Sequence, residues 1–336
     1  MKTPKFWQQR TLWSYLFLPL ALLYRGIASL DRSIKLKKMQ TLPRPVIVVG
    51  NINLGGTGKT PVTITLVNRF KARGFNVGVL SRGYGRKTDA LLIADTHHSA
   101  SDLGDEPYLI YQKTGVPLAV HRNRYEAGVA LLKQHPEIDL FICDDGLQHH
   151  ILHRDLEIGV VGKQGFGNKL GFPAGPLREP ISRLNKVDFI INNSGNLDLK
   201  KYDFTPPQFT LQSVLNEAIN LKTGEAKPLY HWQNQGVSAI AGIAYPEHFF
   251  AMLRDHNIDV MGYGFPDHHH FTKKDLAALD TPLFMTEKDA VKCQDLALDL
   301  NNAWKVPLET TLPEALIDAI LKTLNLDVKP NSKTHV

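Results

Sequence analysis

The chain has 336 residues, enough for about two domains, and its 43 % hydrophobic and 21 % charged residues exclude disorder of the whole chain. The net charge of +6 comes from the first 44 residues, which contain nine basic residues and one acidic residue, so the rest is slightly acidic. This distribution argues against a general nucleic-acid-binding surface. The two cysteines, Cys143 and Cys293, exclude a disulfide framework and fit a reducing cytosol.

A mostly apolar segment of fourteen residues, 11–24, lies between Arg10 and Arg25. It is shorter than the ~20 residues needed to cross a bilayer, and no clear small-x-small cleavage site of a secretory signal follows it. Its aromatic residues and leucines, followed by a basic run through Lys38, favour a helix that lies in an anionic membrane interface. Packing on the protein's own core, or a signal or true span, are the alternative readings.

A glycine-rich loop, GNINLGGTGKTP over residues 50–61, follows the β-branched run 46–49 and precedes a helical pattern over 60–70. In a phosphate-binding loop, this order lets backbone N–H groups and the helix N-terminus converge on phosphate oxygens. Asn53 stands where the full motif has its first glycine, and we expect it there because asparagine enters the positive-φ region readily. The expected nucleotide contacts are Asn53, Leu54, Gly55, Gly56, Thr57, Gly58, Lys59, Thr60 and Pro61.

A second apolar run, IDLFICDD over residues 138–145, ends in two carboxylates. This is the form of a Walker B strand, whose aspartate helps to bind Mg²⁺. Lys59 is expected to reach the β- and γ-phosphates of the nucleotide, and Thr60 to hold the metal together with Asp144 and Asp145.

Strand-like runs near 46–50, 76–80, 117–120, 138–143, 156–161 and 188–192 alternate with helical patterns. The alternation predicts an α/β fold of the P-loop NTPase type, with a mainly parallel sheet and helices on both faces, plus a second, smaller α/β domain joined by a two-stranded linker. The expected regions are an interface helix (1–30), the P-loop domain (31–204), a first linker strand (205–230), the smaller domain (231–303), a return strand with a last helix (304–326) and a disordered tail (327–336).

Six further segments occur in order after the glycine loop: SRGYGR (81–86), GDEP (104–107), DDGLQHH (144–150), PAGPLREP (173–180), FPDHH (265–269) and TEKDAVK (286–292). Together they resemble the tetraacyldisaccharide 4′-kinase family, the lipid A 4′-kinases of Gram-negative bacteria. The resemblance implies transfer of the ATP γ-phosphoryl group, with Mg²⁺, to the 4′-hydroxyl of a tetraacyldisaccharide 1-phosphate, which gives lipid IVA. It also implies a peripheral protein at the cytoplasmic face of the inner membrane, with a lipid substrate and no obligate protein partner.

The resemblance assigns roles to individual residues. It places Asp105 and His268 as the pair that receives the hydroxyl proton, beside the catalytic Lys59; an N-cap of the following helix is a second, compatible reading of Asp105. It places Glu179 near the metal and Arg178 on a nucleotide phosphate. Candidates for contacts with substrate or phosphates are Arg82, Arg86, Arg124, Gln148 and His149.

Several readings stay open from the sequence. Arg82 and Arg86 could equally be solvated surface charges, Arg122 competes with Arg124, and His149, His150 and His153 either orient the carboxylates or cap a turn. The alternative function is a membrane-associated P-loop ATPase or GTPase switch. Leu54, where partitioning ATPases have a lysine, argues against it, as does the guanine-like motif NKVD (185–188), which precedes its strand instead of following it.

Overall fold

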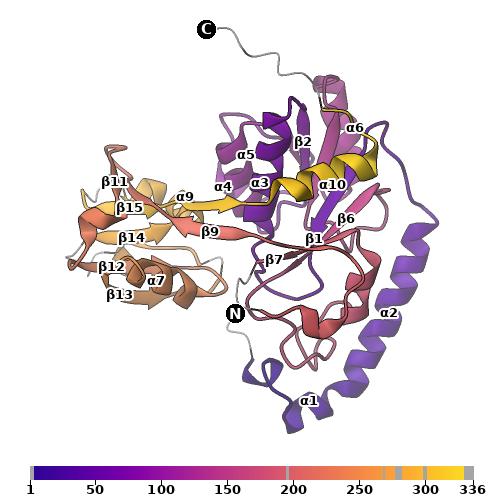
Figure 1. Cartoon of the computed structure of the whole chain (residues 1–336), viewed down its shortest axis with the longest axis horizontal. Helices are drawn as coiled ribbons and strands as arrows, with labels where there is room; N and C mark the ends of the chain where they lie inside the picture. The colour runs from indigo at the N-terminus through magenta and orange to yellow at the C-terminus, as the bar shows by residue number, and fades with distance from the viewer. Residues whose placement is uncertain (1–3, 194–196, 268, 277–281, 298–300, 329–336) are drawn as a thin grey trace. The chain divides into compact units, whose positions relative to one another are not determined.

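The computed structural model describes residues 4–193, 197–267, 269–276, 282–297 and 301–328 (Figure 1). His268 and most of the expected tail therefore lie outside the described residues. The chain divides into two compact units, one formed by Thr3–Gln212 with Thr311–Val336 and the other by Ser213–Thr310. Each unit has its own sheet and its own hydrophobic core.

The larger unit is built on an eight-stranded sheet with the order β3-β4-β2-β5-β1-β6-β7-β8. Neighbouring strands are parallel except β3 and β4, which confirms the predicted mainly parallel sheet. The strands are β1 (Val46–Gly50), β2 (Val77–Ser81), β3 (Leu92–Ile93), β4 (Leu118–Val120), β5 (Leu140–Asp144), β6 (Leu156–Val161), β7 (Phe189–Asn192) and β8 (Gln208–Thr210).

Both faces of this sheet are buried. Since successive side chains of a strand point to opposite sides, neighbouring residues belong to different core clusters. On β1, Ile47 and Val49 belong to one core cluster, together with residues of α3 (Lys59–Ala72), α5 (Asp105–Thr114) and α10 (Glu314–Leu324). Val46 and Val48 belong to the cluster on the other face, which includes residues of α6 (Arg124–Gln134). The carboxyl ends of β1 and β5, which are hydrogen-bonded neighbours, consequently lie side by side at one edge.

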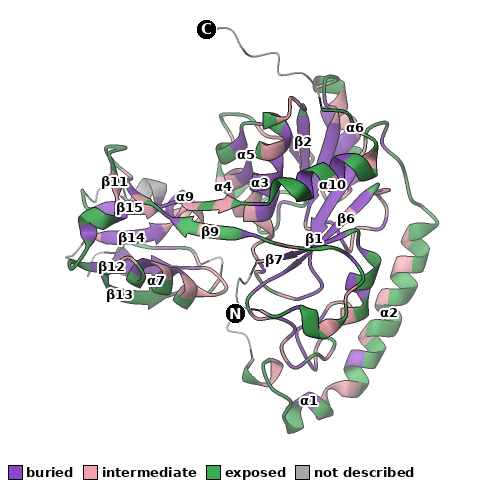
Figure 2. Ribbon diagram, in the orientation of Figure 1, coloured by how far each residue is buried: buried purple, intermediate pink, exposed green. Residues whose placement is uncertain are grey.

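The N-terminal segment forms a short turn η1 (Lys5–Trp7) and the helices α1 (Leu12–Leu16) and α2 (Leu18–Leu36). It is tied to the loop after β6: Trp7 Nε1 donates to Pro173 O at 2.9 Å, and Asn168 Nδ2 donates to Phe6 O at 2.8 Å. Most large apolar side chains of α1 and α2 are exposed (Figure 2); they are Leu12, Trp13, Tyr15, Leu16, Leu20, Leu22, Leu23, Ile27, Leu30, Ile34 and Leu36. Among the described helices, none has the length and hydropathy of a membrane span.

The smaller unit contains a six-stranded sheet with the order β11-β10-β15-β14-β12-β13, in which β10 is antiparallel to both of its neighbours and the pairs from β15 to β13 are parallel. Trp232, Phe284 and Trp304 pack together in its core. Its strands are β10 (Glu217–Asn220), β11 (Ala226–Pro228), β12 (Gly236–Ala241), β13 (Asp259–Gly264), β14 (Leu283–Thr286) and β15 (Ala303–Val306), and its helices are α7 (Pro246–Arg254), α8 (Lys273–Leu276) and α9 (Glu287–Ala297).

The chain passes between the units twice, within β9 (Gln212–Leu215) and β16 (Leu308–Thr311). These strands form a two-stranded sheet, which is the linker that the sequence predicts. The residues expected as the first linker strand, 205–230, are divided among three sheets, because β8 extends the large sheet while β10 and β11 form a hairpin at the edge of the small one.

Candidate active site

The phosphate-binding loop is held in place by three side chains that follow the ends of strands. Asn51 Nδ2, after β1, donates to Thr57 Oγ1 at 2.8 Å, and Asn193 Nδ2, after β7, donates to Thr57 O at 3.0 Å. Gln164 Nε2, after β6, donates to Gly56 O at 3.3 Å. Sequence reasoning missed all three, although a polar residue just beyond a buried parallel strand is a usable signal for a ligand site at that edge.

Two glycines give the loop its left-handed turns. Gly55 has a φ of 95° and Gly58 a φ of 78°, and Gly58 is the N-cap of α3, so Lys59 and Thr60 form the first turn of the helix. A Cβ atom on Gly58 would also collide with the side-chain amide of Asn193. The helix N-terminus is thereby aimed at the loop, which is the arrangement that receives a phosphate.

The expectation that Asn53 adopts a positive φ is wrong, since Asn53 is not among the left-handed residues. Its side chain is buried, and Nδ2 donates to Gly165 O at 2.8 Å, while its backbone bridges to Leu177. Asparagine therefore replaces the motif's first glycine by anchoring the loop through its amide, not by relaxing the backbone.

The two carboxylates at the end of β5 have different surroundings. Asp144 is buried, and Oδ1 accepts a hydrogen bond from Thr63 Oγ1 at 2.9 Å. Burial, together with the charges of Glu106 and Asp145, raises the pKa of Asp144 to about 7. The effect of the Glu106 charge on the pKa of Asp144 indicates that the start of α5, where the GDEP segment lies, is near the end of β5.

Asp145 faces the cations of the site. Its Oδ1 lies 3.5 Å from Lys59 Nζ, and its Oδ2 lies 3.6 Å from Arg178 Nη1. Burial would raise the pKa of Asp145, but Lys59, Arg178 and Arg124 outweigh that effect and hold the pKa below its ordinary value. Asp145 is thus the ionised carboxylate of the pair, held by the lysine that the motif assigns to phosphate.

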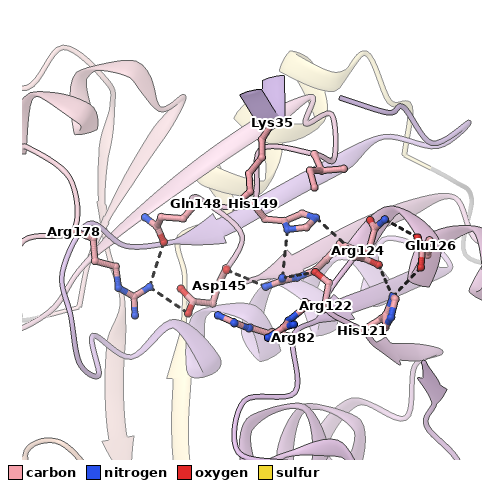
Figure 3. A pocket seen from close by; sticks show the side chains of 12 residues that line it. Lys35, Arg82, His121, Arg122, Arg124, Glu126, Asp145, Gln148, His149 and Arg178 are labelled. Atoms are coloured by element: carbon pink, nitrogen blue, oxygen red, sulfur yellow. Dashed lines mark hydrogen bonds and ion pairs between the residues drawn. The ribbon is translucent and has the colours of Figure 1, made fainter. Parts of the chain in front are cut away.

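Gln148 connects two further predicted site residues, Arg178 and Glu179. Its Nε2 donates to Glu179 Oε1 at 2.7 Å. Its Oε1 accepts from Arg178 Nη1 at 3.3 Å, as Figure 3 shows. Lys59, Asp145, Gln148, Arg178 and Glu179, which are distant in sequence, therefore form one connected group of polar contacts.

A cavity of about 560 Å³ lies beside this group, and its lining is strongly basic. Figure 3 shows arginines from several segments around it. The lining residues are Lys35, Arg82, His121, Arg122, Asn123, Arg124, Glu126, Asp145, Gln148, His149, Ile151 and Arg178. Five fixed cations against two carboxylates favour an anionic ligand. Sequence reasoning missed Lys35 and His121, and it ranked Arg122 below Arg124 although both line the cavity.

Arg124 and His149 form a buried contact at the cavity wall. Arg124 is 5 % exposed, its Nη1 lies 3.4 Å from His149 Nδ1, and its Nη2 donates to Asp145 O at 3.5 Å. Burial and the charges of Arg124 and Arg154 lower the pKa of His149 to about 3, so the imidazole is neutral at physiological pH. Of the other two histidines, His150 lies 3.4 Å from Arg154 Nη2 and His153 pairs with Asp155.

Other predicted residues lie outside this group of contacts. Arg86 Nη1 donates to Val120 O at 3.3 Å, whereas Arg82 lines the cavity. Asp105 is the first residue of α5 and Gly104 is its N-cap, so the capping role considered for Asp105 is not the one observed. His268 lies outside the described residues.

The oxygen donors near Lys59 fit Mg²⁺ only if the nucleotide shares in binding it. Within the described part of the chain, no group of three or more His, Cys, Asp or Glu residues could hold a metal ion. Mg²⁺ in kinase sites needs one or two carboxylates, with phosphate oxygens and waters completing the shell. Asp145 Oδ1 is buried and accepts no hydrogen bond, which suits it to that role. Thr60, in the first turn of α3, is the second candidate.

Comparisons with known proteins agree with one another. The family model described as tetraacyldisaccharide-1-P 4′-kinase matches residues 13–325. The chain is 43 % identical over 338 residues to the tetraacyldisaccharide 4′-kinase of Stenotrophomonas maltophilia, with 98 % of each chain covered, and 42 % identical to that of Dechloromonas aromatica, with 94 % of each covered. It also resembles the crystal structure of LpxK from Aquifex aeolicus in complex with ATP, with a TM-score of 0.77 and 29 % identity over 92 % of this chain and 99 % of that one.

We expect Gly58→Ala to abolish ATP binding, because the new methyl group would collide with Asn193 and strain a left-handed residue. Gly115→Ala is the matched control: Gly115 is also left-handed, with a φ of 61°, but nothing lies within 4 Å of its added Cβ. The left-handed conformation should cost each variant about 1–2 kcal/mol of stability, and only Gly58→Ala, which adds the collision with Asn193, should fail to bind ATP in a calorimetric titration. Retained ATP binding would contradict the assignment of the loop.

Proposed function

The chain belongs to the tetraacyldisaccharide-1-P 4′-kinase family, and we propose that it transfers the γ-phosphoryl group of ATP to the 4′-hydroxyl of a tetraacyldisaccharide 1-phosphate. The observation that carries the proposal is the adjacency of two sites: a phosphate loop with its lysine held by Asp145, and a basic cavity that shares Asp145 and Arg178 with it. A hydrolytic switch has no use for the second site.

The nucleotide half of the reaction follows from the loop. Backbone N–H groups of residues 55–58 and the start of α3 surround the phosphates, and Lys59 neutralises the β- and γ-phosphates. With ATP bound, Lys59 would exchange part of its interaction with Asp145 for the phosphates, and Asp145 would then be able to help hold Mg²⁺. Arg178, which lies 3.6 Å from Asp145, supplies a second positive charge on the transferring group.

The acceptor half is assigned to the basic cavity. A sugar phosphate carries negative charge that Arg82, Arg122 and Arg124 would neutralise, and about 560 Å³ accommodates a polar headgroup but not acyl chains. The chains would lie outside. Lys35 belongs to α2 and lines the cavity, so the helix with the exposed apolar residues borders the headgroup site.

Transfer to a hydroxyl requires a group that removes its proton. We assign this role to Asp105, assisted by His268, on the basis of the family resemblance. Asp105 begins α5, and the charge of its neighbour Glu106 raises the pKa of Asp144 at the end of β5. This supports a position of Asp105 near the site. Asp105 takes the proton, and Lys59 and Arg178 stabilise the transferring phosphoryl group. Bound Mg²⁺ would neutralise further charge, with Thr60, Asp145 and Glu179 as its candidate protein ligands. Asp144, which the sequence predicts with them, is a poorer candidate because it bonds to Thr63 and burial raises its pKa.

We place the protein at the cytoplasmic face of the inner membrane, held peripherally by α1 and α2. The support is the row of exposed apolar side chains on these helices together with basic residues of the same segment, Arg25, Arg32, Lys35, Lys37 and Lys38. A helix with apolar residues and flanking lysines and arginines binds anionic lipid interfaces.

Purified protein with ATP, Mg²⁺ and a tetraacyldisaccharide 1-phosphate acceptor tests the proposed reaction. We expect acceptor-dependent transfer of labelled phosphate to the lipid and little ATP hydrolysis without acceptor. Acceptor-independent hydrolysis with no labelled lipid would favour the switch instead.

Asp105→Ala should reduce phosphoryl transfer by about 100-fold or more, the size of effect that a general base supplies, with ATP affinity nearly unchanged. Asp102→Ala is a suitable control, because Asp102 lies in the preceding short helix and bonds to Ser99. The rate of transfer and the ATP dissociation constant are measured separately. Equal loss of both would remove Asp105 from the role of base.

Replacing Leu22, Leu23 and Ile27 with asparagine should weaken binding to vesicles of anionic phospholipid by about tenfold or more, since each side chain would lose its burial in lipid. The matched control replaces two apolar side chains that are exposed in the smaller unit, Tyr230 and Met261. Co-sedimentation with vesicles measures the effect, and unchanged partitioning of the triple variant would remove the membrane role of α2.

A further inference from the structure

A chain of four charged side chains runs from β6 to the candidate active site. Arg154 Nη1 pairs with Glu157 Oε1 at 2.8 Å, and Arg183 Nη2 lies 2.7 Å from each Glu157 oxygen. Arg183 Nε in turn lies 3.3 Å from Glu179 Oε2. Arg183, in the short helix η2 (Ile181–Lys186), therefore stands between the two carboxylates of Glu157 and Glu179.

All four side chains are largely buried. Arg183 is 5 % exposed, and Arg154, Glu157 and Glu179 are between 12 % and 15 % exposed. The group contains two positive and two negative charges, so it is neutral as a whole. Each member is needed for that balance, because a buried charge without a partner is strongly unfavourable.

This chain of charges holds Gln148 from two sides. Arg154 donates to Leu147 O at 3.0 Å and to His149 O at 2.7 Å, which fixes the backbone on either side of Gln148. Glu179, held by Arg183, accepts a hydrogen bond from the Gln148 side chain at 2.7 Å. Gln148 then bonds to Arg178, which pairs with Asp145.

We propose that Arg183 is a positioning residue for phosphoryl transfer: it holds the Glu179 carboxylate in place beside Gln148, so that Glu179 is ready to bind the Mg²⁺ ion that accompanies ATP. The inference rests on the proposed function, because it concerns the site that binds MgATP. Without Arg183, the hydrogen bond from Gln148 is the remaining side-chain contact of the Glu179 carboxylate among the described residues. The carboxylate would then no longer be fixed where a Mg²⁺ ion could use it.

An arginine is required at this position for geometric reasons. Its guanidinium hydrogen-bonds to Glu157 through Nη2 and at the same time forms an ion pair with Glu179 through Nε, at 3.3 Å and without hydrogen-bond geometry. A lysine carries one ammonium group at the end of a flexible stem and cannot bridge both carboxylates in this way. Arg183→Lys therefore retains the buried positive charge while it removes the bridge.

The test compares Arg183→Lys and Arg183→Met with the wild type. Binding of ATP is titrated by calorimetry at increasing Mg²⁺ concentration, with no lipid acceptor present. We expect the Mg²⁺ concentration that gives half of the full ATP affinity to rise about 10-fold or more in both variants, with binding of metal-free ATP changed by less than about twofold. Wild-type Mg²⁺ dependence in either folded variant would overturn the proposal.

Arg73→Met is the control, because Arg73 also pairs with two carboxylates, Glu314 and Asp318, but on the surface between α3 and α10. It should leave the Mg²⁺ dependence of ATP binding at the wild-type value. Urea unfolding of each variant shows whether it is folded. If Arg183→Met is not, Arg183→Lys and Glu157→Gln, which weakens the same bridge from the other end, carry the comparison.

A double variant separates positioning from general destabilisation. If Arg183 acts through Glu179, then Arg183→Lys should add less than about twofold to the effect of Glu179→Gln on the Mg²⁺ dependence. Fully multiplicative effects of the two substitutions would overturn the proposal. Because these titrations contain no acceptor, their outcome is independent of the lipid assay: absence of transfer to the lipid by the wild type would contradict the proposed function, and not the role of Arg183.

Discussion

The arrangement of the site depends on the parallel pairing of β1 with β5, in which Val49 is the partner of Asp144. Parallel neighbours end at the same edge of a sheet, so the phosphate loop that follows β1 and the carboxylates that end β5 must lie together. The 3.5 Å separation of Lys59 Nζ and Asp145 Oδ1 is the result. The strand order therefore places Lys59, Asp145 and the N-terminus of α3 next to one another.

The two carboxylates at the end of β5 differ in their protonation behaviour. Asp144 is withdrawn toward Thr63, where burial raises its pKa, whereas Asp145 remains ionised among Lys59, Arg178 and Arg124. Two adjacent carboxylates thus differ in character because of their neighbours and not because of their chemistry. The same reasoning applies to Glu179, whose negative charge is balanced by Arg183. Lys59 and Arg178, which pair with Asp145, are therefore not needed to neutralise Glu179.

Much of this could be predicted from the sequence. The β-branched run before Gly50 and the apolar run before Asp144 identified the two central strands, and the motif spacing identified Lys59 and Asp145. These predictions depend on local pattern and on a general property of parallel sheets. The role of Asn53 was predicted wrongly, since the choice between a backbone turn and a side-chain anchor depends on Gly165, which is distant in sequence. Asn193, Arg183 and Lys35 were missed for the same reason: isolated polar residues have no periodicity, and only the fold shows what they contact.

The neutral state of His149 has a consequence for the basic cavity. An imidazole with a pKa near 7 would make the cavity's attraction for an anion vary with small changes in cytoplasmic acidity. Burial beside Arg124 removes His149 from titration, with a pKa of about 3, and the positive charge rests on guanidinium groups that do not lose their protons. The ring can still accept a hydrogen bond while it contributes no charge, so His149 itself adds no pH dependence to the binding of a phosphate at this wall of the cavity.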